Sequence, residues 1–263
     1  GGSMLLDAAV VAPDERHTII VTHDVTERRR VDDMRRDFVA NVSHELRTPL
    51  TVIAGFLELA DMDVPPELRK RHLVLMRDQT ARMKRLTDDL LMLSKLENRD
   101  ERAADQPELI DMSALVDDAV REGMAYSNMQ HKFEVKHEDL SLLGYPEEIR
   151  SAVLNLITNA VRYTPRGGRI QVVWKRVGTG AVLTVADTGI GIAPEHLPRI
   201  TERFYRVDKG RSRDTGGTGL GLAIVKHVMR RAGGELIVHS TPGEGSKFML
   251  RFPEERLFSG RYL

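Results

Sequence analysis

His44 and Glu45 are neighbours in the sequence, and Thr48 follows them by about one helical turn. A neutral imidazole nitrogen is a nucleophile, and an adjacent carboxylate can hold or accept the proton on the second ring nitrogen. The pair could therefore form a covalent bond with an electrophile. A solvated surface histidine beside a glutamate is the ordinary alternative, and these residue types alone do not exclude it.

The apolar residues around His44 recur three or four positions apart, which is typical of one face of a long amphipathic helix. They are Met34, Phe38, Val42, Leu46, Leu50, Ile53, Leu57 and Ala60. At about 100° per residue, His44 lies about 200° from both Val42 and Leu46, so a helix that buries those two holds the imidazole toward solvent. Pro49 cannot donate a hydrogen bond to the carbonyl of Glu45 and should loosen this turn.

A second group of polar residues and glycines lies in the C-terminal half. Asn155 and Asn159 are four residues apart, hence on one helix face, where asparagine is unfavourable unless its amide has a partner. That partner could be a ligand or a structural hydrogen-bond network. Asp187 follows a strand-like run, and Gly189 and Gly191 come next, where the backbone must approach something closely.

A glycine-rich loop at 216–221 precedes a helix whose N-terminal amides could receive phosphate oxygens. The basic residues Arg206, Lys209, Arg211 and Arg213 lie before this loop and suit a mobile lid over an anionic ligand. Taken singly, the glycine loops are weak evidence, because neither fits the dinucleotide-binding or the P-loop pattern.

Two long helices and a following α/β region must position these residues. The periodicity predicts helices over 27–61 and 67–97, joined by a turn at 61–66 into an antiparallel hairpin. Each hairpin leaves apolar positions that a second copy would cover, which favours a dimeric four-helix bundle. After a linker, strand-like runs at 133–137, 169–176, 181–186, 235–240 and 247–252 alternate with helices predicted at 113–123, 146–163 and 218–232. That order favours a mixed sheet with helices on one face, a two-layer α/β sandwich.

Composition excludes several classes of protein. The 263 residues suit one large or two modest domains, and the 39 basic and 39 acidic residues cancel, so no net field favours nucleic acid. The absence of cysteine excludes disulfides and thiolate metal sites and fits a reducing compartment. No apolar run approaches the roughly 20 residues needed to cross a bilayer, so we expect this chain to be soluble.

The start of the chain suggests a longer natural protein. Gly1-Gly2-Ser3 before Met4 is similar to the remnant of a cleaved tag, and the missing part could hold membrane spans. Residues 17–25 form a β-branched run typical of a strand, which alone cannot pair its edges. We interpret it as the last strand of a preceding domain, because 24–28 is similar to the exit of PAS-type sensor domains. A disordered leader is the alternative.

The segment Ser43-His44-Glu45-Leu46-Arg47-Thr48-Pro49-Leu50 closely resembles the phospho-acceptor box of bacterial sensor histidine kinases. Four later stretches resemble, in order, the N, G1, F and G2 boxes of the ATP-binding fold that these kinases share with Hsp90-type chaperones, MutL-type repair proteins and type II topoisomerases. They contain Asn155, Asp187, Phe204 and Gly219. The resemblance covers about residues 26–253, and the stretches 36–44 and 201–209 look like the sensor kinases of the phosphate regulon.

The resemblance implies a role for each matching residue. His44 would be the phosphorylated residue, Glu45 would take or orient its second ring proton, and Thr48 would orient water for dephosphorylation of a partner. Asp187 would accept from the adenine amino group, with Gly189 and Gly191 beside the ring. Asn159 would ligate Mg²⁺, and Asn155 would help to hold metal and phosphates. The other implied nucleotide contacts are Arg162, Tyr163, Arg206, Gly217, Thr218, Gly219, Leu220, Gly221 and Ser246.

One position departs from the family pattern. The family usually has lysine where this chain has Arg162. Arginine keeps the positive charge but not the point-like geometry of an ammonium group, so the phosphate contact expected there is less defined.

These expectations divide the chain into five parts. Residues 1–26 hold the tag remnant and the remnant of a PAS-like sensor domain, and 27–98 form the dimerisation and histidine-phosphotransfer hairpin. Residues 99–107 are a linker, 108–255 form the catalytic ATP-binding domain of the GHKL type, and 256–263 form a C-terminal tail.

The resemblance implies a histidine kinase of a two-component system, an ATP:protein-histidine phosphotransferase that uses ATP and Mg²⁺. It would act as a homodimer, pass the phosphoryl group to the receiver domain of a response regulator, and also dephosphorylate that regulator, with phosphate starvation as the signal. The longer protein would be anchored in the bacterial inner membrane with this portion in the cytoplasm, and no nucleic-acid partner is expected. Two alternatives stay open: an ATP-driven conformational clamp, and a non-catalytic dimeric scaffold.

Overall fold

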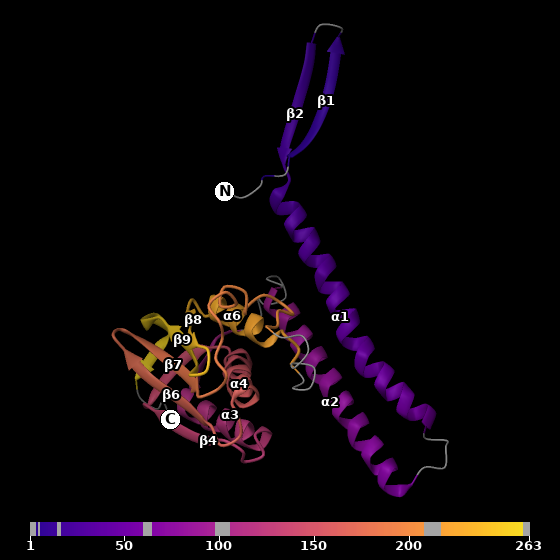
Figure 1. The fold of residues 1–263 in the computed structure, drawn as a ribbon. Helices are drawn as coiled ribbons and strands as arrows, with labels where there is room; N and C mark the ends of the chain where they lie inside the picture. Colours follow the sequence, from indigo (N-terminus) through magenta and orange to yellow (C-terminus); the bar gives the residue numbers. More distant parts are fainter. Residues whose placement is uncertain are drawn as a thin grey trace. The chain divides into compact units, whose positions relative to one another are not determined.

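The computed structural model describes residues 4, 6–14, 17–59, 65–97, 106–207 and 217–259. The chain divides into two compact units, residues 1–80 and 81–263. The boundary falls inside a continuous helix, so the second half of that helix belongs to the second unit (Figure 1). No helix in the described ranges combines the length and apolar character that a membrane crossing requires.

The first unit begins with a β-hairpin. Strand β1, Leu6–Asp14, pairs antiparallel with β2, His17–Asp24, in a register that joins Leu6 to Asp24. The prediction of a strand at 17–25 is confirmed, and the structure adds a partner strand before it that was not predicted. Strand β1 escaped the sequence analysis because its alanines and Pro13 are poor strand formers.

Helix α1, Thr26–Glu58, follows β2 with only Val25 between them. The Oδ1 atom of Asp24 accepts a hydrogen bond of 2.9 Å from the backbone amide of Thr26, which satisfies one of the free amides at the helix start. The helix runs through Pro49 without ending, as the sequence pattern predicted.

Helix α2, Pro66–Glu97, opens with proline, whose missing amide is harmless in the first turn. The predicted turn at 61–66 lies mostly outside the described residues, as does most of the predicted linker at 99–107. Within the first unit the rings of Phe56 and His72 stack with centroids 4.7 Å apart, which joins the end of α1 to the start of α2. The predicted helical hairpin is confirmed.

The second unit is built on a five-stranded mixed sheet in the order β4-β6-β7-β9-β8. The strands are β4 Lys132–His137, β6 Arg169–Val177, β7 Gly180–Asp187, β8 Glu235–Thr241 and β9 Gly245–Phe252. Strands β4 and β6 are parallel, and the other neighbours are antiparallel. Parallel pairing of β4 with β6 requires a long crossover, which the intervening helix provides.

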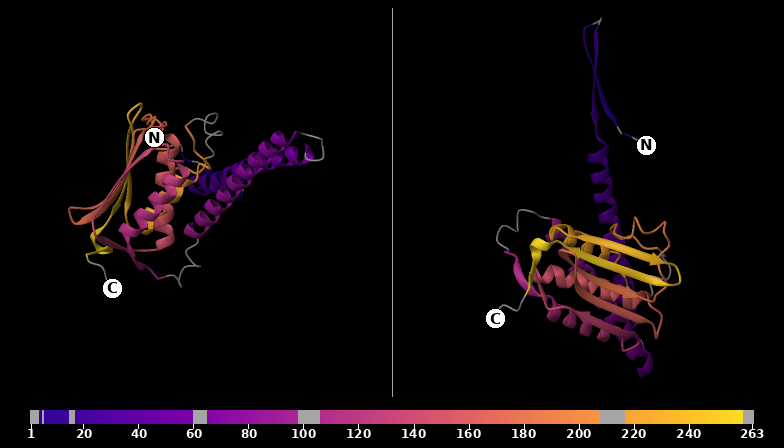
Figure 2. Two further views of the ribbon diagram at one scale, coloured as in Figure 1. Left: turned by 90° about the horizontal axis from the view of Figure 1, so that it is seen from below. Right: turned by 90° about the vertical axis from the view of Figure 1, so that its left-hand side faces the viewer.

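Three helices cover one face of this sheet: α3 Met112–Tyr126, α4 Pro146–Tyr163 and α6 Gly221–Arg231 (Figure 2). The core between the two layers is apolar, and Leu156, Trp174, Leu183, Ile224 and Leu250 are fully buried in it. The indole of Trp174 satisfies its donor by a 3.0 Å hydrogen bond to the carbonyl of Leu140. The predicted two-layer α/β sandwich is confirmed.

A second, three-stranded sheet in the order β10-β5-β3 was not predicted. Its strands are β3 Glu108–Asp111, β5 Leu140–Gly144 and β10 Leu257–Ser259, and a short 3-10 helix, η3 Glu254–Arg256, precedes the last of them. Runs of three to five residues carry too little periodicity to separate a strand from a loop.

Candidate functional site

The side chain of His44 is exposed on α1, while Val42 and Leu46 are half-buried, as the helical phase predicted. The hydroxyl of Thr48 donates a 3.2 Å hydrogen bond to the carbonyl of His44, one turn back. Thr51 donates in the same way to the carbonyl of Arg47. Hydrogen bonds from a threonine hydroxyl to the carbonyl four residues earlier favour bending of a helix. Here the two threonines lie on either side of Pro49.

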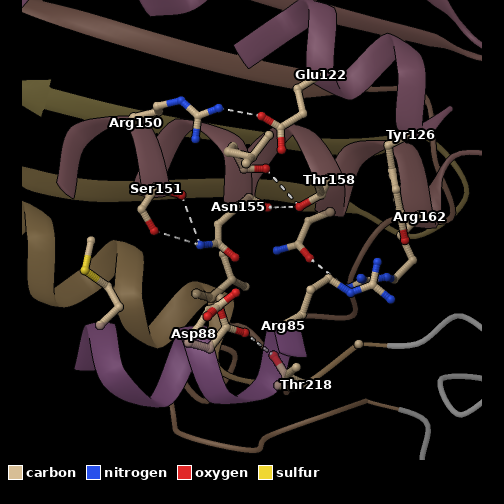
Figure 3. A pocket seen from close by; sticks show the side chains of 18 of the residues that line it. Arg85, Asp88, Glu122, Tyr126, Arg150, Ser151, Asn155, Thr158, Arg162 and Thr218 are labelled. Carbon is tan, nitrogen blue, oxygen red and sulfur yellow. Dashed lines mark hydrogen bonds and ion pairs between the residues drawn. The ribbon is translucent and has the colours of Figure 1, made fainter. Parts of the chain in front are cut away.

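The second unit contains a cavity of about 920 Å³ between α4, the glycine-rich loop and the second half of α2. Figure 3 shows Asn155, Arg162 and Thr218 around it, together with Arg85 and Asp88 of α2. The predicted nucleotide residues that line it are Asn155, Asn159, Arg162, Tyr163, Arg206, Gly217, Thr218, Gly219 and Gly221. Leu220, Asp187, Gly189, Gly191 and Ser246 are outside this lining. The structure therefore brings the predicted phosphate-binding residues together.

The remaining predicted residues form a second cluster at the end of β7. Asp187 accepts hydrogen bonds through Oδ1 from the amides of Gly189, at 2.8 Å, and Ser246, at 3.3 Å. The hydroxyl of Ser246 lies 2.9 Å from that of Ser240, which also accepts from the amide of Ile192. Burial raises the pKa of the Asp187 carboxyl above its ordinary value, against the two amide bonds that lower it.

The glycines after Asp187 lie against the protein's own backbone. A Cβ atom on Gly189 would come within 2.5 Å of the carbonyl oxygen of Tyr163, and one on Gly191 within 2.0 Å of that of Thr241. Gly191 also has a φ of 69°, which an L-residue adopts with strain. The close approach predicted for these glycines is therefore found, and it is made to α4 and to the turn between β8 and β9.

Each asparagine of α4 has a partner within the protein. The amide of Asn155 donates a 3.0 Å hydrogen bond to the carbonyl of Ser151, and a Cβ on Gly221 would meet the Asn155 oxygen at 2.3 Å. The oxygen of Asn159 accepts from Arg162 at 3.4 Å. Both alternatives left open by the sequence are therefore compatible with the structure: the amides are bonded, and they also line the cavity.

The glycine-rich loop is bound to the segment before it. The amide of Phe204 donates a 2.8 Å hydrogen bond to the carbonyl of Gly219, and both residues have positive φ angles. A Cβ on Gly219 would lie 2.8 Å from the Cα of Phe204, so only glycine fits there. The basic residues Lys209, Arg211 and Arg213 lie outside the described residues, so the predicted lid has no structural account.

Charges of both signs face the cavity. Arg162 of α4 and Arg206 line it on one side, and α2 contributes Arg85, Asp88 and Asp89. The Nε atom of Arg162 is buried without a hydrogen-bond partner among the described residues. A half-buried guanidinium with spare donor capacity suits a bidentate contact with an anion such as a phosphate.

Two family descriptions match this chain. Residues 34–99 match the "His Kinase A (phospho-acceptor) domain", and residues 144–256 match the "Histidine kinase-, DNA gyrase B-, and HSP90-like ATPase". The solved structure of the mycobacterial sensor histidine kinase MprB is 31% identical, with a TM-score of 0.50, over 56% of this chain and 97% of that one. The chain belongs to the sensor histidine kinases.

One curated relative and one further solved structure are similar to this histidine kinase. It is 48% identical to the phosphate regulon sensor protein PhoR of Pseudomonas aeruginosa, over 90% of this chain and 54% of that protein. The histidine kinase ThkA, solved in complex with the response regulator protein TrrA, shares the fold at 22% identity and a TM-score of 0.64, over 90% of this chain and 70% of that one. The predicted similarity to phosphate-regulon sensor kinases is confirmed. The chain spans about half the length of the curated relatives it matches.

The sequence analysis of this histidine kinase missed the contribution of α2 to the cavity. Asp89 hydrogen-bonds Thr218 at 2.8 Å, although the two residues are far apart in the sequence. A signal was present: Asp89 follows Leu86 by three residues and precedes Leu93 by four, so it lies on the apolar stripe of α2. A carboxylate on a buried stripe requires a partner, and Thr218 is that partner.

Proposed function

We propose that this chain is the catalytic portion of a sensor histidine kinase that phosphorylates His44 from ATP. The observation that carries the proposal is the exposed His44, within an intact phospho-acceptor sequence on α1, in the same chain as an ATP-binding domain. A histidine buried in the hairpin would contradict it, because the imidazole must reach a nucleotide held by another domain.

One ring nitrogen of His44 would attack the γ-phosphorus of ATP while the bond to the β–γ bridging oxygen breaks and ADP leaves. The proton on the other ring nitrogen would pass to Glu45 or be oriented by it, a contribution of about 10²- to 10⁴-fold in rate. Positioning and charge stabilisation supply most of the remainder in phosphoryl transfer. In the dephosphorylation of the response regulator, Thr48 would orient a water molecule. For this its hydroxyl must break its hydrogen bond to the carbonyl of His44.

We propose that the adenine is read by Asp187, with Gly189, Gly191 and Ser246 beside it, and that the triphosphate extends into the cavity. Arg162 and Arg206, the amides of 217–221 and Tyr163 would hold the phosphates and the adjoining part of the nucleotide. Among the described residues no three His, Cys, Asp or Glu side chains gather as a metal site. The amide oxygens of Asn159 and Asn155 fit Mg²⁺, which takes few protein ligands and binds through phosphates, where it neutralises developing charge.

The kinase is proposed to act as a homodimer and to transfer the phosphoryl group to an aspartate of a response regulator. Helix α1 supports the first point, because Met34, Val39, Leu50 and Leu57 are all more than half exposed in the single chain. A longer apolar stripe than one hairpin can bury is what a two-fold four-helix bundle requires. The complex of ThkA with its response regulator supports the second point.

The biological setting follows from the relatives. Similarity to PhoR supports phosphate-starvation signalling, and we propose that the whole protein is anchored in the bacterial inner membrane with this portion in the cytoplasm. The division of the chain at 1–26, 27–98, 99–107, 108–255 and 256–263 stays a prediction. Fractionation of the full-length protein tests the localisation, and limited proteolysis tests the boundaries.

Autophosphorylation tests the function directly. Incubation with γ-labelled ATP should place an acid-labile, base-stable phosphate on the wild-type chain and none on His44→Gln. Asn159→Ala should remain unlabelled and should lose Mg-ATP binding by calorimetry. Labelling of His44→Gln would show that another residue is the acceptor, and transfer of label to candidate receiver domains would identify the regulator.

A further inference from the structure

The second half of α2 is packed on the ATP-binding domain within the second unit. Its apolar residues Leu86, Leu93 and Leu96 are buried. At the end of the helix, Glu97 forms an ion pair with Arg203 and lies 3.7 Å from the Nε2 atom of His227. This segment therefore has apolar and charged attachments to the domain that binds the nucleotide.

A third attachment reaches the glycine-rich loop itself. The Oδ2 atom of Asp89 accepts a 2.8 Å hydrogen bond from the hydroxyl of Thr218. The same hydroxyl oxygen accepts from the amide of Leu220 at 3.2 Å. The carboxylate of Asp89 on α2 thus orients the Thr218 hydroxyl, and this hydroxyl accepts a hydrogen bond from the Leu220 amide directly before α6.

That amide is one of the donors from which a phosphate would be expected to accept. Helix N-termini bind anions because their first amides are free and the helix dipole is positive there. Here the Leu220 amide is already bonded to Thr218, and the carboxylate behind Thr218 carries the same sign of charge as a phosphate.

The surroundings of Asp89 keep this charge poorly hydrated. Burial raises the pKa of its carboxyl above the ordinary value, while Thr218, Arg162 and Arg85 lower it and Asp88 raises it further. Arg162 also lines the cavity and lies against the loop, since a Cβ on Gly217 would lie 3.0 Å from its Nη1 atom. Asp89 and a bound phosphate would therefore compete for the positive charge of Arg162.

We propose that Asp89 is a positioning residue that holds the glycine-rich loop through Thr218 and opposes the entry of the triphosphate. Triphosphate binding releases the bond between Asp89 and Thr218. By thermodynamic linkage, the nucleotide then weakens the attachment of α2 to the ATP-binding domain by the same factor. The inference rests on the proposed nucleotide site and assigns to Asp89, a residue of α2 in the lining of the cavity, a role in setting its affinity.

The experiment uses two substitutions at Asp89 and one control. Asp89→Asn keeps the size and the acceptor oxygen but removes the charge, whereas Asp89→Ala removes both. Asp78→Asn is the matched control, because Asp78 is an exposed carboxylate on the first half of α2. Binding of a non-hydrolysable Mg-ATP analogue and of adenosine is measured by calorimetry for each chain.

We expect Asp89→Ala to tighten binding of the triphosphate analogue by about three- to thirty-fold, the range for one partly screened charge. Adenosine affinity should not change, because adenosine has no phosphate to meet Asp89. If Asp89→Asn binds the triphosphate analogue as tightly as Asp89→Ala does, the charge of Asp89 opposes binding. If only Asp89→Ala binds it more tightly, the hydrogen bond to Thr218 opposes binding. Asp78→Asn should match the wild type for both ligands.

Three results would overturn the inference. One is unchanged or weaker triphosphate binding in both Asp89 variants, and another is an equal change for triphosphate and adenosine, which would indicate a general structural effect. The third is a wild-type chain that binds neither ligand, which would also remove the proposed nucleotide site. Nucleotide binding by the wild type without tightening in the variants removes only the role of Asp89.

Discussion

Asp187 is the residue at which stability and binding are most clearly opposed. Its carboxylate is half-buried at the end of β7 and is held by two backbone amides, yet burial still raises its pKa. The ionised form is therefore less favourable in the folded chain than in the unfolded one. Titratable residues whose charged form is unfavourable in the folded protein are typical of binding sites.

We expect Asp187→Asn to raise the free energy of unfolding at neutral pH and to weaken nucleotide binding by about ten- to a hundred-fold. Because the folded pKa is raised, the stability that Asp187 contributes is fully present below its unfolded pKa and is lost as the pH rises through the folded pKa. The advantage of the variant should therefore shrink as the pH falls toward about 4.

Urea unfolding of both chains at neutral and acidic pH, with calorimetric titration of the nucleotide, measures these effects. A constant stability difference across this pH range would contradict the raised pKa. Unchanged affinity would remove Asp187 from the adenine site.

Gly191 gives a second prediction at the scale of single residues. Its φ angle is positive, and an added Cβ would overlap the carbonyl oxygen of Thr241. Gly178 has a similar φ of 61° in the turn between β6 and β7, with open space where a Cβ would stand. The two glycines therefore separate backbone strain from steric overlap.

Gly178→Ala should lower the free energy of unfolding by about 1 to 2 kcal/mol, the strain of a left-handed alanine. Gly191→Ala should lower it by at least about 3 kcal/mol, because the backbone of the β8–β9 turn must also move. Urea denaturation measures both values. Equal losses would mean that the turn relaxes freely and that Gly191 is needed only for its φ angle.

At the scale of elements, α2 is one unbroken helix that contributes to both units. In the first unit His72, Met76 and Gln79 are half-buried, and in the second unit Leu86 and Leu93 are buried. The continuity of the helix fixes the angular phase between these two sets of residues. Any change in its length alters that phase.

Insertion of one alanine after Thr80 should rotate the two sets by about 100° relative to each other and strongly reduce autophosphorylation. Insertion of seven helix-forming residues returns the phase to within about 20° and should retain more activity. Labelling from γ-labelled ATP compares the two chains. Equal loss in both would indicate that the length of α2, rather than its phase, matters.

The helices and strands also show how much of the fold could be predicted from the sequence. Helices α1, α2 and α4 were predicted within a few residues because their apolar residues repeat over several turns. Strands β3, β5 and β10 were missed because pairing with distant segments, and not local pattern, makes them strands. Helix α6 begins at Gly221, three residues later than predicted, because Thr218 to Leu220 form the loop that meets Phe204 and Asp89.

The sequence likewise predicted only part of the candidate site. It predicted the phosphate-binding set that lines the cavity, because the residues belong to short motifs. It holds a signal for Asp89 in its place on the apolar stripe of α2, but it could not identify Thr218 as the partner, because that contact depends on how α2 packs in the second unit. It left open what the glycines after Asp187 approach closely, and in the structure their nearest neighbours are backbone atoms of the protein.

At the scale of the whole molecule, the exposed apolar residues of α1 predict self-association. Leu57 is 57% exposed and lies on the predicted stripe of α1, whereas Leu73 is 48% exposed and lies about 90° from the side of α2 on which His72, Met76 and Gln79 are half-buried. The two leucines are similar in exposure and differ in the face they occupy. They therefore make a matched pair for a test of the dimer.

Leu57→Glu should weaken the dimer by at least about tenfold, because each subunit would bury a charge in the bundle. Leu73→Glu should leave the association unchanged. Sedimentation equilibrium over a range of concentrations measures both dissociation constants. A dimer that tolerates Leu57→Glu would place the interface elsewhere on the chain.

The junction at Val25 has a mechanical consequence. A β-hairpin and a helix of 33 residues are joined by a single residue, and Asp24 braces the first helical turn through the amide of Thr26. A flexible joint would need several free backbone torsions, whereas Val25 supplies only its φ and ψ. Torque applied to the hairpin therefore passes into the helix that carries His44 with little slack, as through a stiff coupling between two shafts.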